Sequence, residues 1–288
     1  MQRHVVLCEL FAVSVLSCVT LCLQVFIYRQ KSPRLIWKTS PALCLFFLST
    51  SAMAIQDFCL ASQWILFGWG VVENIAENTF FLLVVAHVGL VLRQFHNCAT
   101  IALFAQRVYH LLLPTKRART FNHIVISIVL VFFFVGASGA TYNMAINSIS
   151  DRPPVPEGMV TLFALVSMLI RVFFLQLIFT VCITIVIMII GSYMLYLLKK
   201  YKKNKQTTLH RKENKFALYV FYVRFVCETV PFFIDVMLSN TVHIDLGKYI
   251  GPFGALGSAL DFTTKTFVYF MLARKHKISS VILNKNTP

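Results

Sequence analysis

The fold is decided by one stretch, 101-IALFAQRVYHLLLPTKRAR-119. A long apolar run reaches Arg107 there, and a basic turn with Lys116, Arg117 and Arg119 follows. Cytoplasmic loops of membrane proteins are rich in Lys and Arg, so an apolar run that ends in a basic turn is typical of the inner end of a transmembrane helix. We therefore interpret residues 101–119 as the cytoplasmic end of a membrane span.

The composition of the whole chain agrees with this interpretation. Of its 288 residues, 58% are hydrophobic and 13% are charged, and the mean hydropathy is +0.73. Several apolar runs reach the roughly 20 residues that a helix needs to cross the bilayer. They do not alternate as the strands of a membrane barrel do. The net charge of +16 does not indicate a nucleic-acid-binding domain, because the basic residues lie in the connections between apolar runs.

The sequence predicts an all-α membrane protein, a single domain over residues 1–288 that forms a seven-transmembrane helix bundle. The expected spans are about 5–28, 41–63, 78–112, 121–146, 160–198, 216–240 and 249–273.

The distribution of Lys and Arg predicts the orientation of these spans. The connections 29–39, 113–120 and 199–215 and the tail from residue 274 hold nineteen of the 27 basic residues. The alternate connections hold only Arg152 and Lys248, beside several acids. Positive connections stay in the cytoplasm, so we expect the N-terminus outside and the C-terminus inside.

Five charged residues are expected to form a polar network inside the membrane. Arg224 and Glu228, and likewise Asp261 and Lys265, are four residues apart and share a helix face. At ~1.5 Å per residue, Arg93, Glu228 and Asp261 lie about 18–21 Å from the inner ends of their spans. We therefore expect Arg93 to pair with Glu228 or Asp261. Such a network either fixes helix packing alone or forms the floor of a ligand cavity or a bistable latch.

Three further residues are candidates for function. Asp57 and Asp235 lie higher, near the outer boundary, where contact with a ligand in an outer cavity is expected. Pro231 lacks an amide donor and weakens the sixth span, so it is either a hinge or a static kink. Lys265 does not fit a retinal Schiff base, because it precedes Tyr269 by only four residues and has Asp261 as a partner.

Motifs of catalysis and metal binding are not found in the sequence. It has no nucleophile elbow, HExxH, glycine-rich phosphate loop or metal-spaced His/Cys cluster. His87, His96 and His110 are scattered along the third span, where polar packing explains them. We therefore expect no enzyme activity, no cofactor and no metal site.

Two short motifs carry a resemblance to a known family. They are Ala105-Gln106-Arg107 through Leu113-Pro114 at the end of the third span, and Asn214-Lys-Phe-Ala217-Leu218 at the start of the sixth span, with Pro231 inside that span. With seven spans and a short tail, the chain resembles G-protein-coupled receptors and, more specifically, nematode serpentine chemoreceptors, with the Srbc class as the leading candidate.

The resemblance implies a chemosensory receptor of the plasma membrane that binds a small external molecule or peptide in the outer half of the bundle and signals through a heterotrimeric G protein. Arg107, Tyr109, Lys116 and Arg117 would then face the G protein, and membrane lipid would surround the bundle. A transporter or ligand-gated channel that uses the intramembrane charges remains the alternative. A continuous polar face would favour conduction, and a cavity closed below Arg93 would favour reception.

The chain also departs from the rhodopsin-like pattern. Gln106 stands where that pattern has an acid before the arginine, so Arg107 needs another partner at rest, which the sequence does not indicate. The external connection 147–158 has no cysteine for the usual disulfide. Where the pattern has Asn-Pro-x-x-Tyr, this chain has Lys265-Thr-Phe-Val-Tyr269.

Overall fold

A computed structural model describes residues 2–73, 76–113, 119–148, 170–201, 208–242 and 253–285. Within these ranges the chain is almost entirely helical and contains no strand. The helices are α1 (Gln2–Gln30), α2 (Pro33–Thr39), α3 (Pro41–Gly68), α4 (Ala76–Leu112), α5 (Arg119–Ser148), α7 (Ile170–Lys200), α8 (Thr208–Arg224), the π-helix η1 (Phe225–Thr229), α9 (Val230–Thr241) and α11 (Phe253–Lys285).

Six helical segments in the described part of the chain are long and apolar enough to cross a membrane. They are His4–Gln30, Pro41–Gly68, Val84–Leu112, Thr120–Gly139, Ile178–Lys200 and Lys212–Leu238. The protein is therefore a membrane protein with multiple spans. The seventh expected span corresponds to α11, which is not among the six. This helix is less apolar because it contains Asp261 and Lys265.

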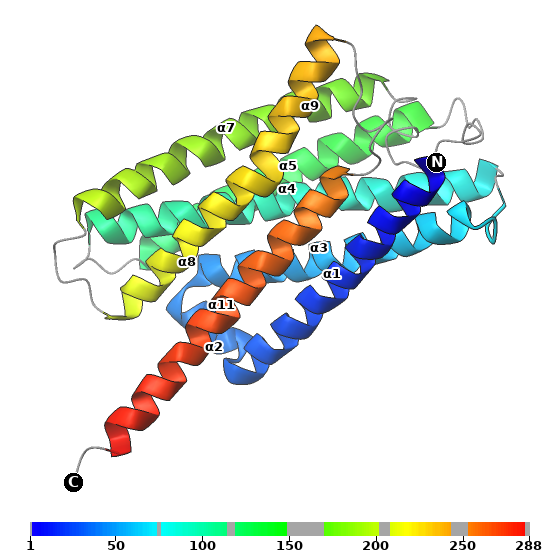
Figure 1. The fold of residues 1–288 in the computed structure, drawn as a ribbon. Helices are drawn as coiled ribbons and strands as arrows, with labels where there is room; N and C mark the ends of the chain where they lie inside the picture. Colours follow the sequence, from blue (N-terminus) through cyan, green and yellow to red (C-terminus); the bar gives the residue numbers. More distant parts are fainter. Residues whose placement is uncertain are drawn as a thin grey trace.

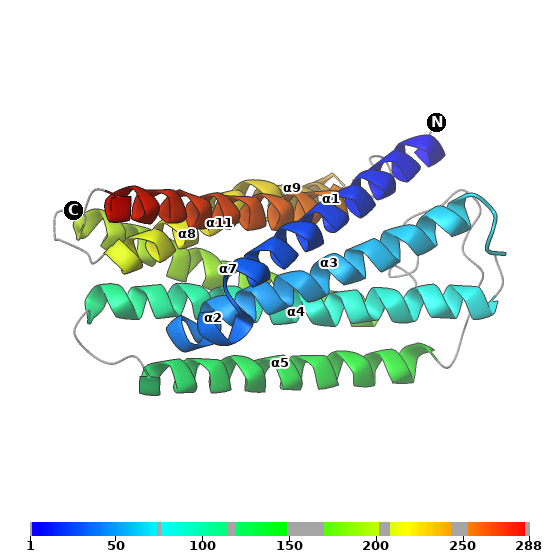
Figure 2. The same ribbon diagram turned by 90° about the horizontal axis from the view of Figure 1, so that it is seen from below.

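The helices form an elongated bundle in which α4 is central (Figures 1 and 2). Helix α4 packs against α3, α5, α7 and α8, while α1 packs between α3 and α11. We use the term basic end for the end of the bundle at which α1, α4 and α7 finish and α3, α5 and α8 begin. The short helix α2 lies at this end, on the left in Figure 1.

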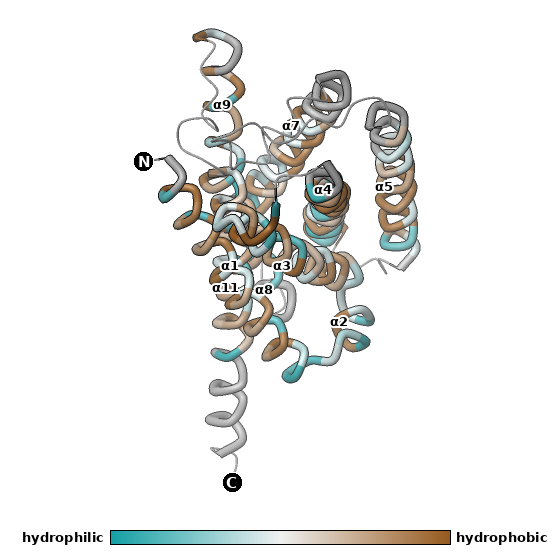
Figure 3. The backbone as a smooth tube through the Cα atoms, turned by 90° about the vertical axis from the view of Figure 1, so that its right-hand side faces the viewer, coloured by the Kyte–Doolittle hydropathy of each residue, from teal (hydrophilic) through white to brown (hydrophobic). Residues whose placement is uncertain are grey.

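Helix α5 lies at the edge of the bundle and consists largely of hydrophobic residues (Figure 3). Only 6% of the most apolar stretch of this helix is buried inside the bundle. The exposed side chains include Ile124, Ile128, Val131, Phe132 and Val135. Such a face is stable only against an apolar medium, so it fits contact with lipid.

Local sequence signals explain several helix ends. Pro33 and Pro41 occupy the first turns of α2 and α3, where a missing amide costs no helix hydrogen bond. At the other end of α3, Gly70 has a φ of 77°. Its amide donates to the Phe67 carbonyl at 3.0 Å, and the Val71 amide donates to the Leu66 carbonyl at 3.0 Å. This pair of bonds is the glycine-dependent closure of a helix C-terminus.

The predicted sixth span differs from the observed helix in one respect. The sequence predicts a single helical span over about 216–240 with Pro231 as a hinge or a static kink, whereas the structure has α8, η1 and α9 in continuous succession from Thr208 to Thr241. The Val230 amide donates to the Phe225 carbonyl, five residues back. The first residues of the expected fifth and seventh spans, 160–169 and 249–252, lie outside the described residues.

Candidate functional site

Arg107 lies at the centre of a polar cluster at the basic end. Its side chain is 1% exposed and forms an ion pair with Glu213 on α8. Its second terminal nitrogen donates to Ser40 Oγ at 2.6 Å and to Gln106 Oε1 at 3.0 Å. Gln106 Nε2 in turn donates to Asn122 Oδ1 on α5 at 2.9 Å. The cluster therefore joins α4 to the start of α3, of α5 and of α8, and Glu213 is the partner that the sequence did not indicate.

The other residues predicted to face a G protein are placed less centrally. Tyr109 is half-buried, and its ring stacks on Phe121 of α5 with centroids 4.1 Å apart. Lys116 and Arg117 lie outside the described residues. Because Arg107 is buried by its partners, its guanidinium faces the bundle and not the solvent in this conformation.

Two ion pairs predicted inside the membrane are confirmed. Arg224 Nη2 lies 3.1 Å from Glu228 Oε2. Lys265 pairs with Asp261, and both side chains are fully buried. In each pair the charges are four residues apart on one face, so each helix neutralises its own charge locally.

Arg224 also ties the sixth span to α4. One of its nitrogens donates to Thr100 Oγ1 at 3.0 Å, and another donates to Asn97 Oδ1. A guanidinium has five donors in a planar fork, which allows it to bond two acceptors on another helix while it keeps its carboxylate partner Glu228. Arg224 directly precedes the π-helix η1, so its side chain connects the start of η1 to α4.

The pairing of Arg93 with Glu228 or Asp261 that the sequence predicts is not present as a direct ion pair. Arg93 donates to Ser258 Oγ on α11 at 3.0 Å, and no ion pair joins it to Glu228 or Asp261. The three residues share a depth, but depth does not fix the direction in which a side chain points around its helix axis. Asp261 is already paired with Lys265, so the hydroxyl one turn earlier on α11 is what Arg93 meets.

Asp57 on α3 is a third acid in this region. It is 5% exposed, and its Oδ2 accepts no hydrogen bond from the described residues. It interacts electrostatically with Arg93 and Glu228. Asp235, the other acid predicted near the outer boundary, is half-buried on α9.

These residues form what we term the intramembrane charge cluster. Its members are Asp57, Arg93, Arg224, Glu228, Asp261 and Lys265, contributed by α3, α4, α8, η1 and α11. Three cations face three acids, so the cluster is neutral as a whole. Neutrality matters because an uncompensated charge inside a membrane is costly.

The surroundings of His96 are those of a packing residue, as the sequence predicts. The ring is 1% exposed and lies between Phe46 and Phe262, with centroid distances of 5.1 and 4.9 Å. Its Nδ1 lies 3.0 Å from Ser49 Oγ.

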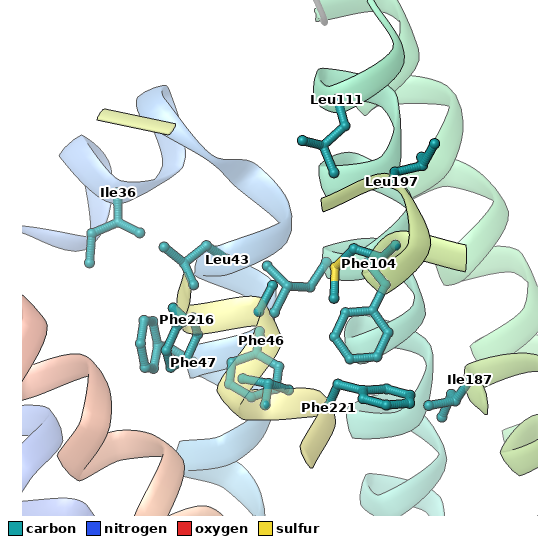
Figure 4. Close-up of a cluster of buried hydrophobic side chains, with 14 of the residues drawn as sticks. Ile36, Leu43, Phe46, Phe47, Phe104, Leu111, Ile187, Leu197, Phe216 and Phe221 are labelled. Atoms are coloured by element: carbon teal, nitrogen blue, oxygen red, sulfur yellow. The ribbon is translucent and has the colours of Figure 1, made fainter. Parts of the chain in front are cut away.

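An aromatic layer separates the intramembrane charge cluster from Arg107. Phe46 and Phe47 of α3 meet Phe216 of α8, with ring centroids 5.8–5.9 Å apart, and Phe104 of α4 meets Phe221 of α8 at 6.2 Å. All five belong to one buried cluster (Figure 4). Positions 93, 97, 100, 104 and 107 share one face of α4, and the phenylalanine at 104 interrupts the polar residues on that face.

Pro231 lies in the first turn of α9, directly after η1. Proline has no amide to donate to the carbonyl four residues earlier, which is that of Cys227. That carbonyl packs closely on Gly257 of α11, where a Cβ would lie 2.5 Å from the oxygen. The π-helix and the proline make this the irregular point of the sixth span, and α11 supports it closely.

Glu213, Asn97 and Ser258 are site residues that the sequence interpretation missed. Glu213 carried a usable signal, since it is the only acid within the four basic segments 29–39, 113–120, 199–215 and 274–288. Asn97 and Ser258 carried none, because polar uncharged residues are common in membrane helices and their partners are distant in sequence.

Comparison with known proteins leaves the family of this chain open. No protein-family model matches it, and no curated protein matches it in sequence.

Proposed function

We propose that the chain is a seven-span G-protein-coupled chemosensory receptor of the plasma membrane, similar to nematode serpentine chemoreceptors, with the Srbc class as the leading candidate. Its N-terminus is outside and its C-terminus inside. A small molecule or peptide binds in the outer half of the bundle, and a heterotrimeric G protein binds at the basic end.

The seventh span in this proposal is α11. Its 33 residues extend about 50 Å, which exceeds the hydrocarbon thickness. It packs against α1 and α8, and the Asp261–Lys265 pair cancels the two charges in its interior. Seven spans with alternating basic connections require opposite sides for the two termini, as proposed.

The observation that carries the proposal is the contact between Arg107 and Glu213. It joins α4 to α8 at the basic end, at the boundary of a long apolar helix. The helix that bears Glu213 has an irregular point at η1 and Pro231, so it is suited to bend. A ligand that binds the bent arrangement more tightly shifts the population toward it, which separates the pair and opens the basic end.

The alternative, a transporter or channel, has one observation in its favour, the intramembrane charge cluster. The aromatic layer between this cluster and Arg107 weighs against it, because a conduction path requires polar contact across the bundle. Reception requires no such continuity.

The experiment is expression of the full chain with a panel of Gα chimeras and a chemical library. Glu213→Gln removes one charge of the pair and is expected to raise ligand-independent signalling. The pair is partly shielded from solvent, so about 1–2 kcal/mol and a roughly 5- to 30-fold change in the population are expected. Lys215→Gln, on the exposed side of the same helix, is the matched control and leaves basal signalling unchanged.

Two results would overturn the proposal. One is silence with every chimera and compound combined with an unchanged basal signal in Glu213→Gln. The other is a ligand-independent ion current from the purified chain in planar bilayers, which supports the channel alternative.

A further inference from the structure

The four segments that adjoin the basic end contain far more basic than acidic residues. Nineteen Lys and Arg residues and one acid, Glu213, lie in the segments 29–39, 113–120, 199–215 and 274–288. Glu213 is already paired with the buried Arg107. Lys31, in the turn between α1 and α2, repels Lys212 on α8. The excess of positive charge makes this surface attractive to an anion from outside the chain.

Helix α2 is the part of this surface with the most specific arrangement. Ile36 is 2% exposed and packs into the core, whereas Arg34 and Lys38 are exposed. Arg34 and Lys38 are four residues apart, so they share the face opposite Ile36. Two like charges at this spacing destabilise a helix unless an anion lies between them.

The apolar residues of α2 indicate which kind of anion fits. Leu35 is 50% exposed and Trp37 is 42% exposed, and they flank the two cations. The last turns of α1, just before α2, expose Val25 and Phe26 in the same way. A soluble anion bound to Arg34 and Lys38 would give Leu35 and Trp37 no apolar contact. A lipid offers a phosphate for the cations and acyl chains for the apolar side chains, and Trp is enriched at membrane–water interfaces.

We propose that α2 is a binding site for anionic phospholipid, in which Arg34 and Lys38 hold the headgroup phosphate while Leu35 and Trp37 contact its acyl chains. Each cation near an anionic membrane surface contributes a factor of roughly five to lipid affinity. The site depends only on the chain being in a membrane and holds whether or not the protein signals.

The test uses the emission of Trp37 and lipids with brominated acyl chains, which quench tryptophan on contact. The full chain is reconstituted in phosphatidylcholine nanodiscs that contain a minor fraction of brominated phosphatidylglycerol. Parallel discs contain the same fraction of brominated phosphatidylcholine. The Trp37 signal is obtained as the difference between the parent chain and Trp37→Phe.

Stronger quenching by the brominated phosphatidylglycerol is expected, and it falls as salt is added because the attraction is electrostatic. The double variant Arg34→Gln/Lys38→Gln loses this excess. Lys199→Gln/Lys200→Gln, which removes the same charge from exposed positions at the end of α7, retains it and is the matched control.

Three outcomes would overturn the proposal. The first is equal quenching by the two lipids. The second is an excess that both double variants lose equally, because the attraction would then belong to the whole basic end and not to α2. The third is displacement of brominated phosphatidylglycerol, at constant ionic strength, by inorganic phosphate or by a soluble polyglutamate peptide, which would indicate a site for soluble anions or acidic proteins.

Discussion

Replacement of Lys265 by methionine tests whether the charges inside the bundle act as pairs. The Lys265 and Asp261 side chains are both fully buried, and Asp261 Oδ1 has no hydrogen-bond partner among the described residues. Methionine is also a long, unbranched side chain, so it keeps most of the packing while it removes the positive charge. Asp261 is then left with Arg224 as a more distant cation, which is already paired with Glu228.

The cost follows from two independent arguments. Removal of one partner of a buried ion pair destabilises proteins by about 3–5 kcal/mol. Without Lys265, Asp261 can also avoid a buried charge by taking up a proton. At pH 7 this protonation costs about 4 kcal/mol for a carboxyl with an ordinary pKa of about 4, and that value limits the destabilisation. We therefore expect Lys265→Met to lower the free energy of unfolding by about 3–4 kcal/mol and the midpoint temperature of thermal unfolding by roughly 10 °C.

The assay is thermal unfolding of the full chain in detergent micelles, run as a double-mutant cycle. Asp261→Leu alone is expected to be similarly unstable, because it leaves a buried ammonium. The double variant Asp261→Leu/Lys265→Met restores neutrality and is expected to unfold within about 1 kcal/mol of the parent, since an apolar replacement of a buried pair is often neutral. A double variant as unstable as the worse single variant would refute the pairing.

Two further predictions concern the contacts of the sixth span. Gly257→Ala forces its methyl against the Cys227 carbonyl and is expected to cost about 1–3 kcal/mol, whereas Gly254→Ala, with open space around it, leaves the unfolding midpoint unchanged or slightly higher. Equal midpoints for the two would count against close packing of η1 on α11. Asn97→Leu removes an acceptor of Arg224 and is expected to lower unfolding free energy by about 2 kcal/mol. A parent-like midpoint for this variant would mean that Arg224 does not depend on α4.

The features that the sequence predicted well are those set by local spacing. Apolar runs of span length must become helices in lipid, since every backbone amide needs a partner. The pairs Arg224–Glu228 and Asp261–Lys265 follow from the periodicity of one helix, which brings residues four apart together whatever the rest of the fold does.

The features that it predicted poorly depend on how helices rotate about their axes. Arg107 and Glu213 are 106 residues apart, and Arg93 and Ser258 are 165 residues apart. Counting residues from the end of a span gives the depth of a side chain but not its direction. The π-helix was missed for a related reason, because its five residues, Phe225–Thr229, have no composition that distinguishes them from an ordinary apolar helix.

The position of Pro231 explains how the two polar clusters can respond differently to one motion in the proposed receptor. Along the helix, Glu213 lies about 27 Å from Pro231 and Arg224 about 10 Å. A bend of about 10° at the proline therefore moves Glu213 by roughly 5 Å but Arg224 by only roughly 2 Å. The first displacement separates Glu213 from Arg107, while the second is within the reach of a flexible guanidinium that bonds Asn97 and Thr100. In this motion the intramembrane charge cluster keeps its contacts, and the Arg107–Glu213 pair at the basic end is the contact that opens.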